Sequence, residues 1–367
     1  MKYKYNLKPD GTEISHSNVF ESIGYCHGHP WMMFHRAQLI AFLYEKLNER
    51  DSRVLTNKEV VSIDTYDHGV KVRCLDGSVF EGSIVIGADG VHSTVRCLMN
   101  RVAAAPANVL PITDAPFVTY YRGLYGHGPR PEVLQLHTMY ETHGDDFTIQ
   151  VNVSAEQVSF FIYERLPKPT RERLHYSAAD TEKFAKRFAQ QHVTQQLKFG
   201  DLWASRKWAK LANVEEGIVK TWHCDRIVLL GDAAHKMAPN AGLGLNCGLQ
   251  SAVVLANILR GQLSRSSCPD TKSLVDCFAK YQASRFRDVK RTIDISGLYT
   301  RVVAWQNLAW KIIDLHVSPH TGGDIQLVKT LISPLIQKGA VLDFISESAF
   351  QQGKLPWRHT PIVCKRT

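Results

Sequence analysis

The sequence of 367 residues lacks the features of membrane-spanning and secreted proteins. No stretch is apolar over the ~20 residues that a membrane-spanning helix requires. The N-terminus carries positive charge but has no apolar segment behind it, so it does not look like a secretory signal. The eight cysteines form no Cys-x-x-Cys pair and show no zinc-site spacing, which favours reduced thiols and no bound metal. We therefore expect an intracellular protein that is soluble or peripherally attached to a membrane.

Clustered charge of one sign is also lacking. The formal net charge of +9 arises from 44 Lys and Arg against 35 Asp and Glu, and the basic residues are scattered singly and in pairs. Because no basic run is interleaved with aromatic residues, nucleic acid is not expected as a partner. The basic balance favours acidic ligands or anionic membrane surfaces. A content of 44% hydrophobic and 22% charged residues is that of a globular protein long enough for two domains.

Hydrophobic periodicity predicts a mixed α/β organisation. Residues 37–49 form an expected amphipathic helix, and the runs 60–65, 70–75 and 83–88 are expected strands of a meander. The alternating runs 147–153 and 158–163 indicate a sheet-based α+β domain inserted at 101–222. A strand at 227–230 then returns to the first domain, formed by residues 1–100 and 223–300, and a helical tail covers 301–367. The helix after this strand has apolar residues at helical spacing: Leu245, Leu249, Val253, Ala256 and Leu259.

The most informative segment runs from Arg226 to Asn246 and reads RIVLLGDAAHKMAPNAGLGLN. A short apolar strand ends at Gly231-Asp232, and a loop of small residues opens a helix. Gly242 and Gly244 remove Cβ atoms where a flat ligand would lie against the backbone. The N–H groups at the start of the helix suit an anion or an electron-rich ring, and Asp232 can accept hydrogen bonds from hydroxyls. A plain strand-to-helix turn is the alternative, and the length of the pattern favours a ligand site.

With these residues, the chain resembles the flavoprotein hydroxylases that share the fold of para-hydroxybenzoate hydroxylase. The resemblance implies that Gly231 and Asp232 contact the ribityl chain of FAD. It also implies that NADPH or NADH donates electrons, and that O2 is the oxygen source. The fold expected from the resemblance is an α/β FAD-binding domain with the inserted sheet domain for the substrate.

A second motif supports the same family. Asp89-Gly90 follows an apolar strand and precedes a short expected helix with Arg96, and the family motif implies contacts with FAD and the pyrophosphate of the nicotinamide donor. Arg36, ahead of the first long helix, stands where the family has an FAD-binding arginine. An Asp-Gly pair alone would be an ordinary turn, but two motifs in the family order favour a common site.

The resemblance narrows to fungal enzymes that epoxidise prenyl chains in indole-diterpene and meroterpenoid pathways. It extends from about residue 6 to 357 and rests on four segments: 28–30, 236–242, 305–308 and 339–344. It implies epoxidation of a terminal alkene in a prenylated secondary metabolite; hydroxylation of an aromatic or polyketide ring and a non-catalytic paralogue are the alternatives. Tyr121, which precedes Tyr125-Gly126, is implied to orient the substrate, and simple packing of an aromatic ring in the sheet stays open.

The chain departs from the family in two places. The family usually has Gly-Gln-Gly-Ala-Asn where this chain has Gly242 to Asn246, so Leu245 stands where only its backbone amide is expected to meet the flavin. The fingerprint Gly-x-Gly-x-x-Gly and the acidic residue ~20 positions after it are absent. We therefore expect the fold without its first strand-turn-helix, in either a truncated sequence or a decayed paralogue.

Overall fold

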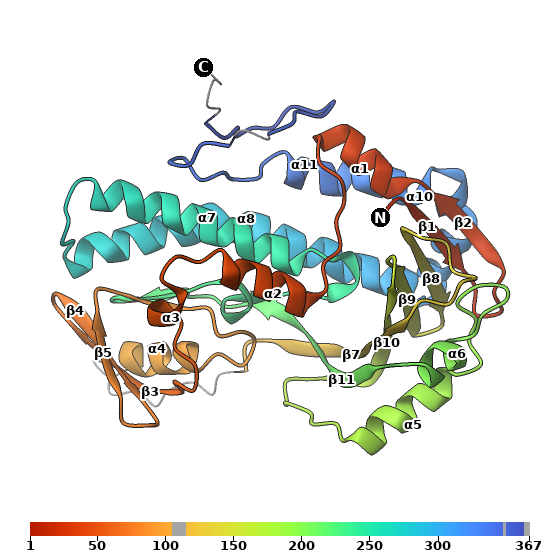
Figure 1. Cartoon of the computed structure of the whole chain (residues 1–367), viewed down its shortest axis with the longest axis horizontal. Coiled ribbons are helices and arrows are strands. Elements are labelled where there is room, and N and C mark those ends of the chain that lie inside the picture. The colour runs from red at the N-terminus through yellow and green to blue at the C-terminus, as the bar shows by residue number, and fades with distance from the viewer. Residues whose placement is uncertain (105–114, 348–349, 363–367) are drawn as a thin grey trace.

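The computed structural model describes residues 1–104, 115–347 and 350–362, and its largest element is an eight-stranded mixed sheet (Figure 1). The strand order is β14-β11-β7-β10-β9-β8-β1-β2. These strands have the following bounds: β1 Tyr3–Leu7, β2 Glu13–Ser17, β7 Val118–Pro129, β8 Thr138–Gly144, β9 Phe147–Val153, β10 Gln157–Thr170, β11 Trp208–Ile218 and β14 His235–Lys236. The expected strands at 147–153 and 158–163 are confirmed as β9 and part of β10.

The two faces of this sheet differ in chemistry. One face is apolar, with residues such as Ile149, Val151 and Phe160 packed against α5 (Ala178–Phe188) and α6 (Phe199–Ala204). The other face carries aromatic, polar and charged side chains and meets the long helix α8 (Thr271–Val303). Because residues alternate between the faces of a strand, β8 and β9 are buried on both sides almost throughout. A sheet covered on both faces can hold a site on one of them.

The first residues of the chain belong to this sheet, although we expected residues 1–100 to form part of the other domain. β1 pairs in parallel with β8, from Tyr3 opposite Thr138 to Leu7 opposite Thr142, and β2 pairs antiparallel with β1. Tyr3, Tyr5 and Leu7 alternate with polar residues, a pattern that favours a strand, and Leu7 lies in the apolar core of the sheet. The cofactor-side elements within residues 1–100 therefore begin after β2.

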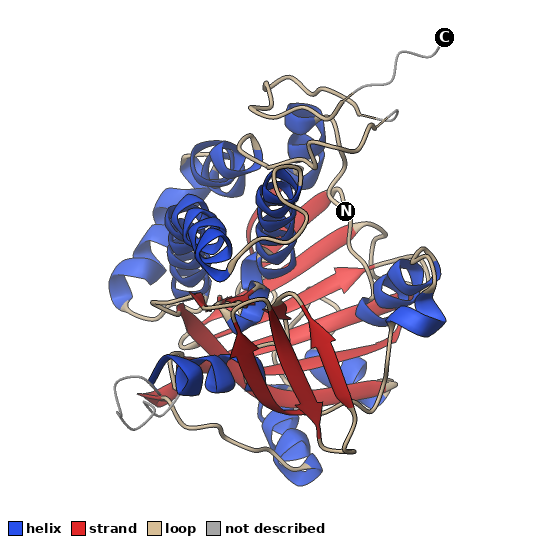
Figure 2. Cartoon of the chain, turned by 90° about the vertical axis from the view of Figure 1, so that its left-hand side faces the viewer, coloured by secondary structure: helices blue, strands red, loops and turns tan. Residues whose placement is uncertain are grey.

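A second, smaller sheet contains β12 (His223–Cys224), β13 (Ile227–Leu229) and β6 (Val85–Gly87), with β13 and β6 parallel. The expected strand at 227–230 is confirmed as β13. The expected meander is present, but its third strand differs from the prediction. Its strands are β3 (Val60–Tyr66), β4 (Gly69–Cys74) and β5 (Val79–Gly82). The run 83–88 leaves the meander after Gly82, because its apolar residues pair with buried β13 as β6. Figure 2 shows the meander in front of the large sheet.

Two expected helices differ from their patterns. α2 (Arg36–Glu45) ends earlier than expected, and none of its residues is buried, so its apolar residues face outwards. α7 (Gly244–Leu263) buries Cys247, Ser251 and Leu255, whereas Leu245 and Leu249 of the expected stripe are exposed. The remaining helical elements are α1 (Val19–His27), α3 (Arg50–Arg53), α4 (Thr94–Ala104), α9 (Leu308–Ile312), η4 (Ile313–Val317), η5 (Ser318–His320), α10 (Gly323–Leu327), η6 (Val328–Ile332) and α11 (Ser333–Ile336).

Arg226, at the start of β13, joins three parts of the cofactor-side region. Its guanidinium, which is almost completely buried, donates to the backbone carbonyls of Tyr66 at 3.1 Å and Ser83 at 3.0 Å. It also donates to the hydroxyl of Thr271, at the start of α8, at 2.9 Å. Since a buried charge requires such partners, Arg226 fixes the meander, β6 and α8 relative to one another.

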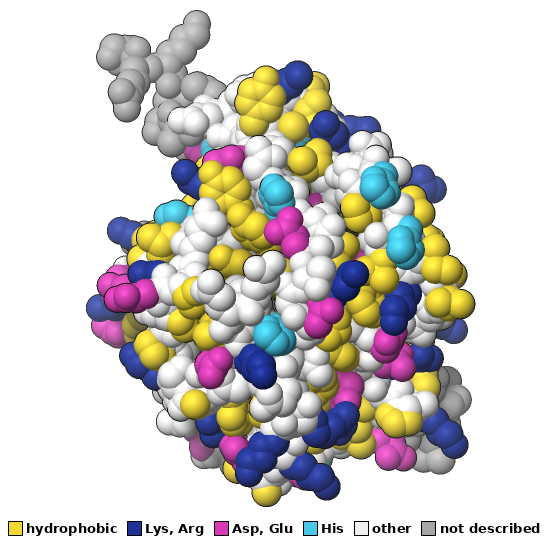
Figure 3. All heavy atoms as spheres, turned by 90° about the vertical axis from the view of Figure 1, so that its right-hand side faces the viewer, with side chains coloured by type: hydrophobic (Ala, Val, Ile, Leu, Met, Phe, Trp, Pro, Cys, Tyr) yellow, Lys and Arg dark blue, Asp and Glu magenta, His cyan; other side chains and the backbone are white. Residues whose placement is uncertain are grey.

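The surface of the molecule carries charged side chains of both signs. Figure 3 shows acidic and basic side chains interspersed over one face of the molecule. Over the residues that the structure describes, no helix is long and apolar enough to cross a membrane, and the cysteines are free thiols. Cys364 lies outside these residues.

Candidate functional site

The two family motifs, which are about 140 positions apart in the sequence, lie side by side in the structure. β6 and β13 run parallel, with Gly87 opposite Leu229, and the amide of Leu230 donates to the carbonyl of Gly87 at 2.9 Å. Asp89-Gly90 follows β6, and Gly231-Asp232 follows β13. Both motifs are therefore at the carboxyl end of the parallel strands, which is where open α/β sheets bind their ligands.

Gly231 forms a tight turn next to α7. Its φ is +58°, a left-handed conformation that disfavours other residues, and a Cβ placed there would meet nothing closer than the Cα of Gly248 in α7, at 4.0 Å. Gly90 and Gly242 also have positive φ, and a Cβ on Gly90 would meet no atom within 4 Å. The backbone at Gly90 thus has open space beside it, whereas Gly231 lies against α7.

The charged residues of the motifs have local partners. Asp232 forms an ion pair with Lys236 and keeps 39% of its side chain exposed, so its carboxylate is accessible to hydroxyl groups. Asp89 caps the start of α4, since its carboxylate accepts hydrogen bonds from the hydroxyl of Ser93 and from the amide of Val95. Arg96 is buried and donates to the carbonyl of Ala233 at 2.9 Å. Direct contacts of Asp89, Gly90 and Arg96 with a cofactor stay a prediction.

The loop between Gly231-Asp232 and α7 brings a helix N-terminus to the same edge. η3 (Pro239–Ala241) ends at Gly242, and α7 begins at Gly244 and continues for 20 residues. Leu245 in its first turn is 56% exposed, and contact of its backbone amide with a cofactor stays a prediction. The first turn of this long helix, with its free N–H groups and the positive end of the helix dipole, therefore lies directly after the loop.

Arg36 is the first residue of α2 and is exposed. The segment leading to it passes the loop, because a Cβ on Gly242 would lie 3.6 Å from Cζ2 of Trp31. The rings of His35 and His127, at the end of β7, are 5.3 Å apart. The structure thus brings the Arg36 segment beside Gly242, but Arg36 does not lie in a closed site.

Tyr121 on β7 lies on the aromatic face of the large sheet and packs with Tyr163, Val214, Ala238 and Ala304. Ala238 belongs to the loop before α7, so this cluster joins the sheet to the loop. The Tyr121 side chain is 1% exposed, its hydroxyl has no partner within the described residues, and burial raises its pKa to about 12. A buried hydroxyl without a partner is costly, so packing alone does not explain this tyrosine, and its contact with a substrate stays a prediction.

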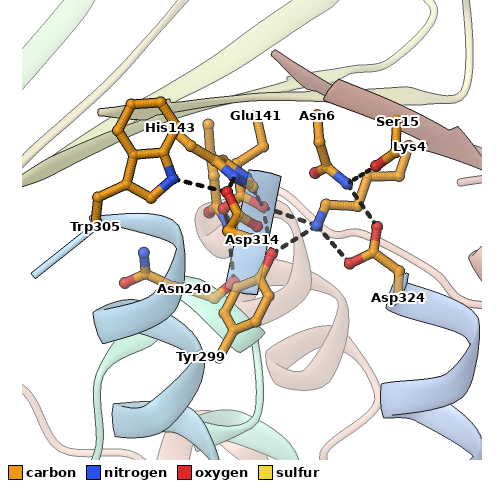
Figure 4. A network of polar contacts seen from close by, with 11 residues as sticks. Lys4, Asn6, Ser15, Glu141, His143, Asn240, Tyr299, Trp305, Asp314 and Asp324 are labelled. Carbon is orange, nitrogen blue, oxygen red and sulfur yellow. Dashed lines mark hydrogen bonds and ion pairs between the residues drawn. The ribbon is translucent and has the colours of Figure 1, made fainter. Parts of the chain in front are cut away.

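Sequence reasoning missed a buried charged cluster on the same face of the sheet: Lys4, Glu141, His143, Tyr299, Trp305, Asp314 and Asp324 (Figure 4). Lys4 Nζ lies 2.8 Å from Glu141 and 2.9 Å from Asp324. Burial alone would raise the pKa of Glu141, but the charges of Lys4 and His143 hold it well below its usual range. The only signal in the sequence is a pair of charged residues within the strand Thr138–Gly144.

The residues at the carboxyl end of β6 and β13 fit the ring and ribityl parts of FAD. A hydroxyl acceptor (Asp232), glycines in left-handed conformations, of which Gly90 has open space beside it, and a helix N-terminus converge there. The loop also carries Asn240, which is 5% exposed and whose side-chain nitrogen and oxygen have no protein partner among the described residues. Such an amide, buried without a partner, is unusual in a protein interior.

Comparisons with known proteins agree with this geometry. The sequence model of the family described as FAD binding domain matches residues 6–271. The chain is 33% identical to the FAD-dependent monooxygenase srdH of Neurospora crassa, over 96% of this chain and 82% of that protein. It is 31% identical to the FAD-dependent monooxygenase ausM of Penicillium brasilianum, over 87% of this chain and 68% of that protein.

Solved structures show the same fold. HpxO of Klebsiella pneumoniae, complexed with FAD and uric acid, superposes with a TM-score of 0.73 at 20% identity, over 92% of this chain and 80% of that one. A salicylate hydroxylase substrate complex gives a TM-score of 0.64 at 17% identity, over 90% of this chain and 78% of that one. The expected fold class, that of the para-hydroxybenzoate hydroxylase group, is confirmed.

Proposed function

Since the chain belongs to the FAD binding domain family, together with fungal FAD-dependent monooxygenases, we propose that it epoxidises an alkene of a prenylated small molecule. The substrate is an intermediate of terpenoid or meroterpenoid secondary metabolism, and NADPH or NADH is the electron donor. The observation that carries this proposal is the aromatic cluster of Tyr121, which packs directly on Ala238 of the loop before α7. The partly buried members of the cluster, Tyr120, Tyr125 and Phe161, form the aromatic surface that an apolar prenyl chain would match, because aromatic side chains bury large apolar areas.

Different residues of the chain would hold different parts of FAD. Asp232 would accept hydrogen bonds from ribityl hydroxyls, and the absence of a side chain at Gly231 and Gly242 would let the ring approach the loop. The N-terminus of α7, at Gly244 and Leu245, supports the electron-rich end of the ring. Arg36 contributes positive charge for the phosphates or adenosine. When bound and reduced by the nicotinamide donor, FAD supplies the activation of O2.

The protein's contribution to the reaction is orientation and exclusion of water. Tyr121 places a hydroxyl among the apolar side chains of Tyr163, Val214 and Ala304. This hydroxyl remains protonated at neutral pH, because burial raises its pKa to about 12. It is therefore a hydrogen-bond donor that orients a polar group of the substrate while the prenyl chain occupies the aromatic surface.

The test is oxygen transfer with labelled O2. The purified protein, supplied with FAD and NADPH or NADH, is incubated under ¹⁸O2 with a prenylated indole or phenol, and with the same ring without its prenyl group. We expect one ¹⁸O atom in the prenylated product, at a position that hydrolyses to a diol. Incorporation into the unprenylated ring instead would show a ring hydroxylase. Absence of both a flavin spectrum and donor oxidation would show a non-catalytic paralogue.

A further inference from the structure

Gln150 on β9 links the buried charged cluster to the loop in front of α7. Its Nε2 donates to Oε1 of Glu141 at 2.6 Å and to the backbone carbonyl of Asn240 at 3.0 Å. We infer that Gln150 and Glu141 are positioning residues, which fix the loop Pro239–Ala241 against the sheet in the conformation that receives the ligand. The inference rests on the proposed function for the identity of that ligand, FAD, and on the contacts alone for the positioning.

The carboxylate of Glu141, to which Gln150 donates, is held in place by several partners. The side chain is completely buried, and Oε2 lies 2.8 Å from Nζ of Lys4 and 3.4 Å from Nε2 of His143. The hydroxyl of Tyr299, on α8, donates to the same oxygen. A buried carboxylate is stable only with such partners, and each partner removes freedom from its position. Oε1 is thus held at one place, where it accepts the hydrogen bond from Gln150.

The cluster is in turn anchored to several elements. Lys4 on β1 also contacts Asp324 of α10 at 2.9 Å. His143 on β8 contacts Asp314 of η4 at 2.7 Å, and the indole nitrogen of Trp305 donates to Asp314 at 2.7 Å. Figure 4 shows these side chains converging between the sheet and the helices, with Asn240 beside Tyr299. Five separate elements therefore define the point from which Gln150 holds the loop.

The loop end of the link carries a group that needs orientation. Asn240 is 5% exposed, and neither polar atom of its side-chain amide has a protein partner among the described residues. On the other side of the loop, the hydroxyl of Ser296 in α8 donates to the carbonyl of Ala238. The bonds from Gln150 and Ser296 hold two carbonyls of the loop from opposite walls. The side-chain amide of Asn240 takes part in neither bond, and both of its polar atoms are buried.

Thr148 provides a matched control. It lies two residues before Gln150 on β9, on the same face of the sheet, and its side chain is completely buried. Its hydroxyl has no hydrogen-bond partner within the described residues. Thr148→Val therefore removes a buried polar atom from the same strand without touching the loop. Gln150→Met removes both hydrogen bonds of Gln150 with little change in volume. Gln150→Asn keeps a buried amide that is one methylene too short to reach both acceptors.

The experiment compares these variants by hydrogen exchange of residues 237–243 without added flavin, and by FAD titration with the visible flavin spectrum. We expect Gln150→Met and Gln150→Asn to exchange about tenfold faster in this segment and to bind FAD about tenfold more weakly, with a shifted flavin spectrum. Thr148→Val should match the wild type in all three measurements. Should Gln150→Met fail to fold, Gln150→Asn decides the outcome.

The experiment distinguishes failure of the positioning role of Gln150 from failure of the proposed function. Unchanged exchange of residues 237–243 in both Gln150 variants would overturn the positioning role, whatever FAD does. A wild-type protein that binds no FAD would overturn the proposed function, whereas faster exchange in the Gln150 variants would still support the positioning of the loop. Equal acceleration in Thr148→Val would also contradict the inference, because it would assign the effect to general loosening of β9.

Discussion

The guanidinium of Arg96 donates a hydrogen bond of 2.9 Å to the backbone carbonyl of Ala233, the residue that follows Gly231-Asp232. A second bond of 2.9 Å reaches the carbonyl of Val91, in the turn after Asp89-Gly90. One buried side chain therefore ties together the turns after both parallel strands. The distance between the two motifs is set by this arginine as well as by the pairing of β6 with β13.

Arg96→Met should lower the free energy of unfolding by about 3 kcal/mol, because at least two buried carbonyls lose a charged donor. The expected result is a lower denaturation midpoint in urea, with weaker FAD binding in the protein that remains folded. Arg101 lies on the same helix but is exposed, so Arg101→Met is the matched control and should change stability by less than about 0.5 kcal/mol. Equal losses in both variants would contradict the role of Arg96.

Asp232→Ala should weaken FAD binding at least tenfold, since a hydrogen bond that involves a charged group contributes about 1.5 to 3 kcal/mol. Fluorescence quenching of FAD during titration measures the dissociation constant. Asp294→Ala is the control, because Asp294 forms the same type of exposed i,i+4 ion pair, with Lys290 on α8. An affinity that does not differ between these two variants would remove Asp232 from the cofactor site.

Tyr121→Phe should reduce turnover of the substrate without loss of stability or FAD affinity. The hydroxyl has no protein partner among the described residues, so its removal leaves no other group unsatisfied and should be neutral or slightly stabilising. Thermal unfolding and steady-state kinetics of the two proteins separate these effects. If Tyr121→Phe is fully active and only Tyr121→Ala is impaired, Tyr121 serves packing alone.

The charged cluster should make stability depend on pH through His143. Burial would lower the pKa of its imidazole, but Asp314, 2.7 Å away, and Glu141, 3.4 Å away, outweigh burial and raise it to about 9. The protonated form is stabilised in the folded state, so its contribution is complete below the unfolded pKa of about 6.5. It is lost as the pH rises through about 9.

Thermal unfolding between about pH 6.5 and 9 measures this dependence. The wild-type protein should lose up to about 3 kcal/mol over the interval, and His143→Gln should be less stable at pH 6.5 but nearly independent of pH above it. His16, an exposed histidine paired with Glu13, provides the control, and His16→Gln should keep the wild-type slope. A slope that survives in His143→Gln would assign the dependence to another group.

The cofactor-side motifs could be located from the sequence because their pattern is local. A buried strand, Gly231-Asp232, a small-residue loop and a helix follow one another within about twenty residues, and the structure keeps this order. The family order of the two motifs also indicated a common site, and parallel pairing of β6 with β13 brings them together. The apolar spacing of α7 was less informative, because its first turns expose Leu245 and Leu249 although both belong to the expected apolar stripe.

The charged cluster could not be predicted, because its members come from distant parts of the chain. Lys4 reads as a surface lysine in a short polar segment, and nothing near it indicates Glu141 or Asp324. Only the parallel pairing of β1 with β8 places Lys4 on the same face as these carboxylates. The role of Gln150 follows from a second pairing, that of β8 with β9, in which Gln150 lies opposite Glu141.

The position of Lys4 has a consequence for the order in which the protein matures. Its partner Asp324 is 320 residues further along the chain. Synthesis proceeds from the N-terminus at about 5 to 20 residues per second, so Lys4 leaves the ribosome long before Asp324 is made. Until then its ammonium group lacks one of the two carboxylates that neutralise it in the interior. Strand β1 can therefore reach its final charged environment only after the 320 residues that separate Lys4 from Asp324 have been made.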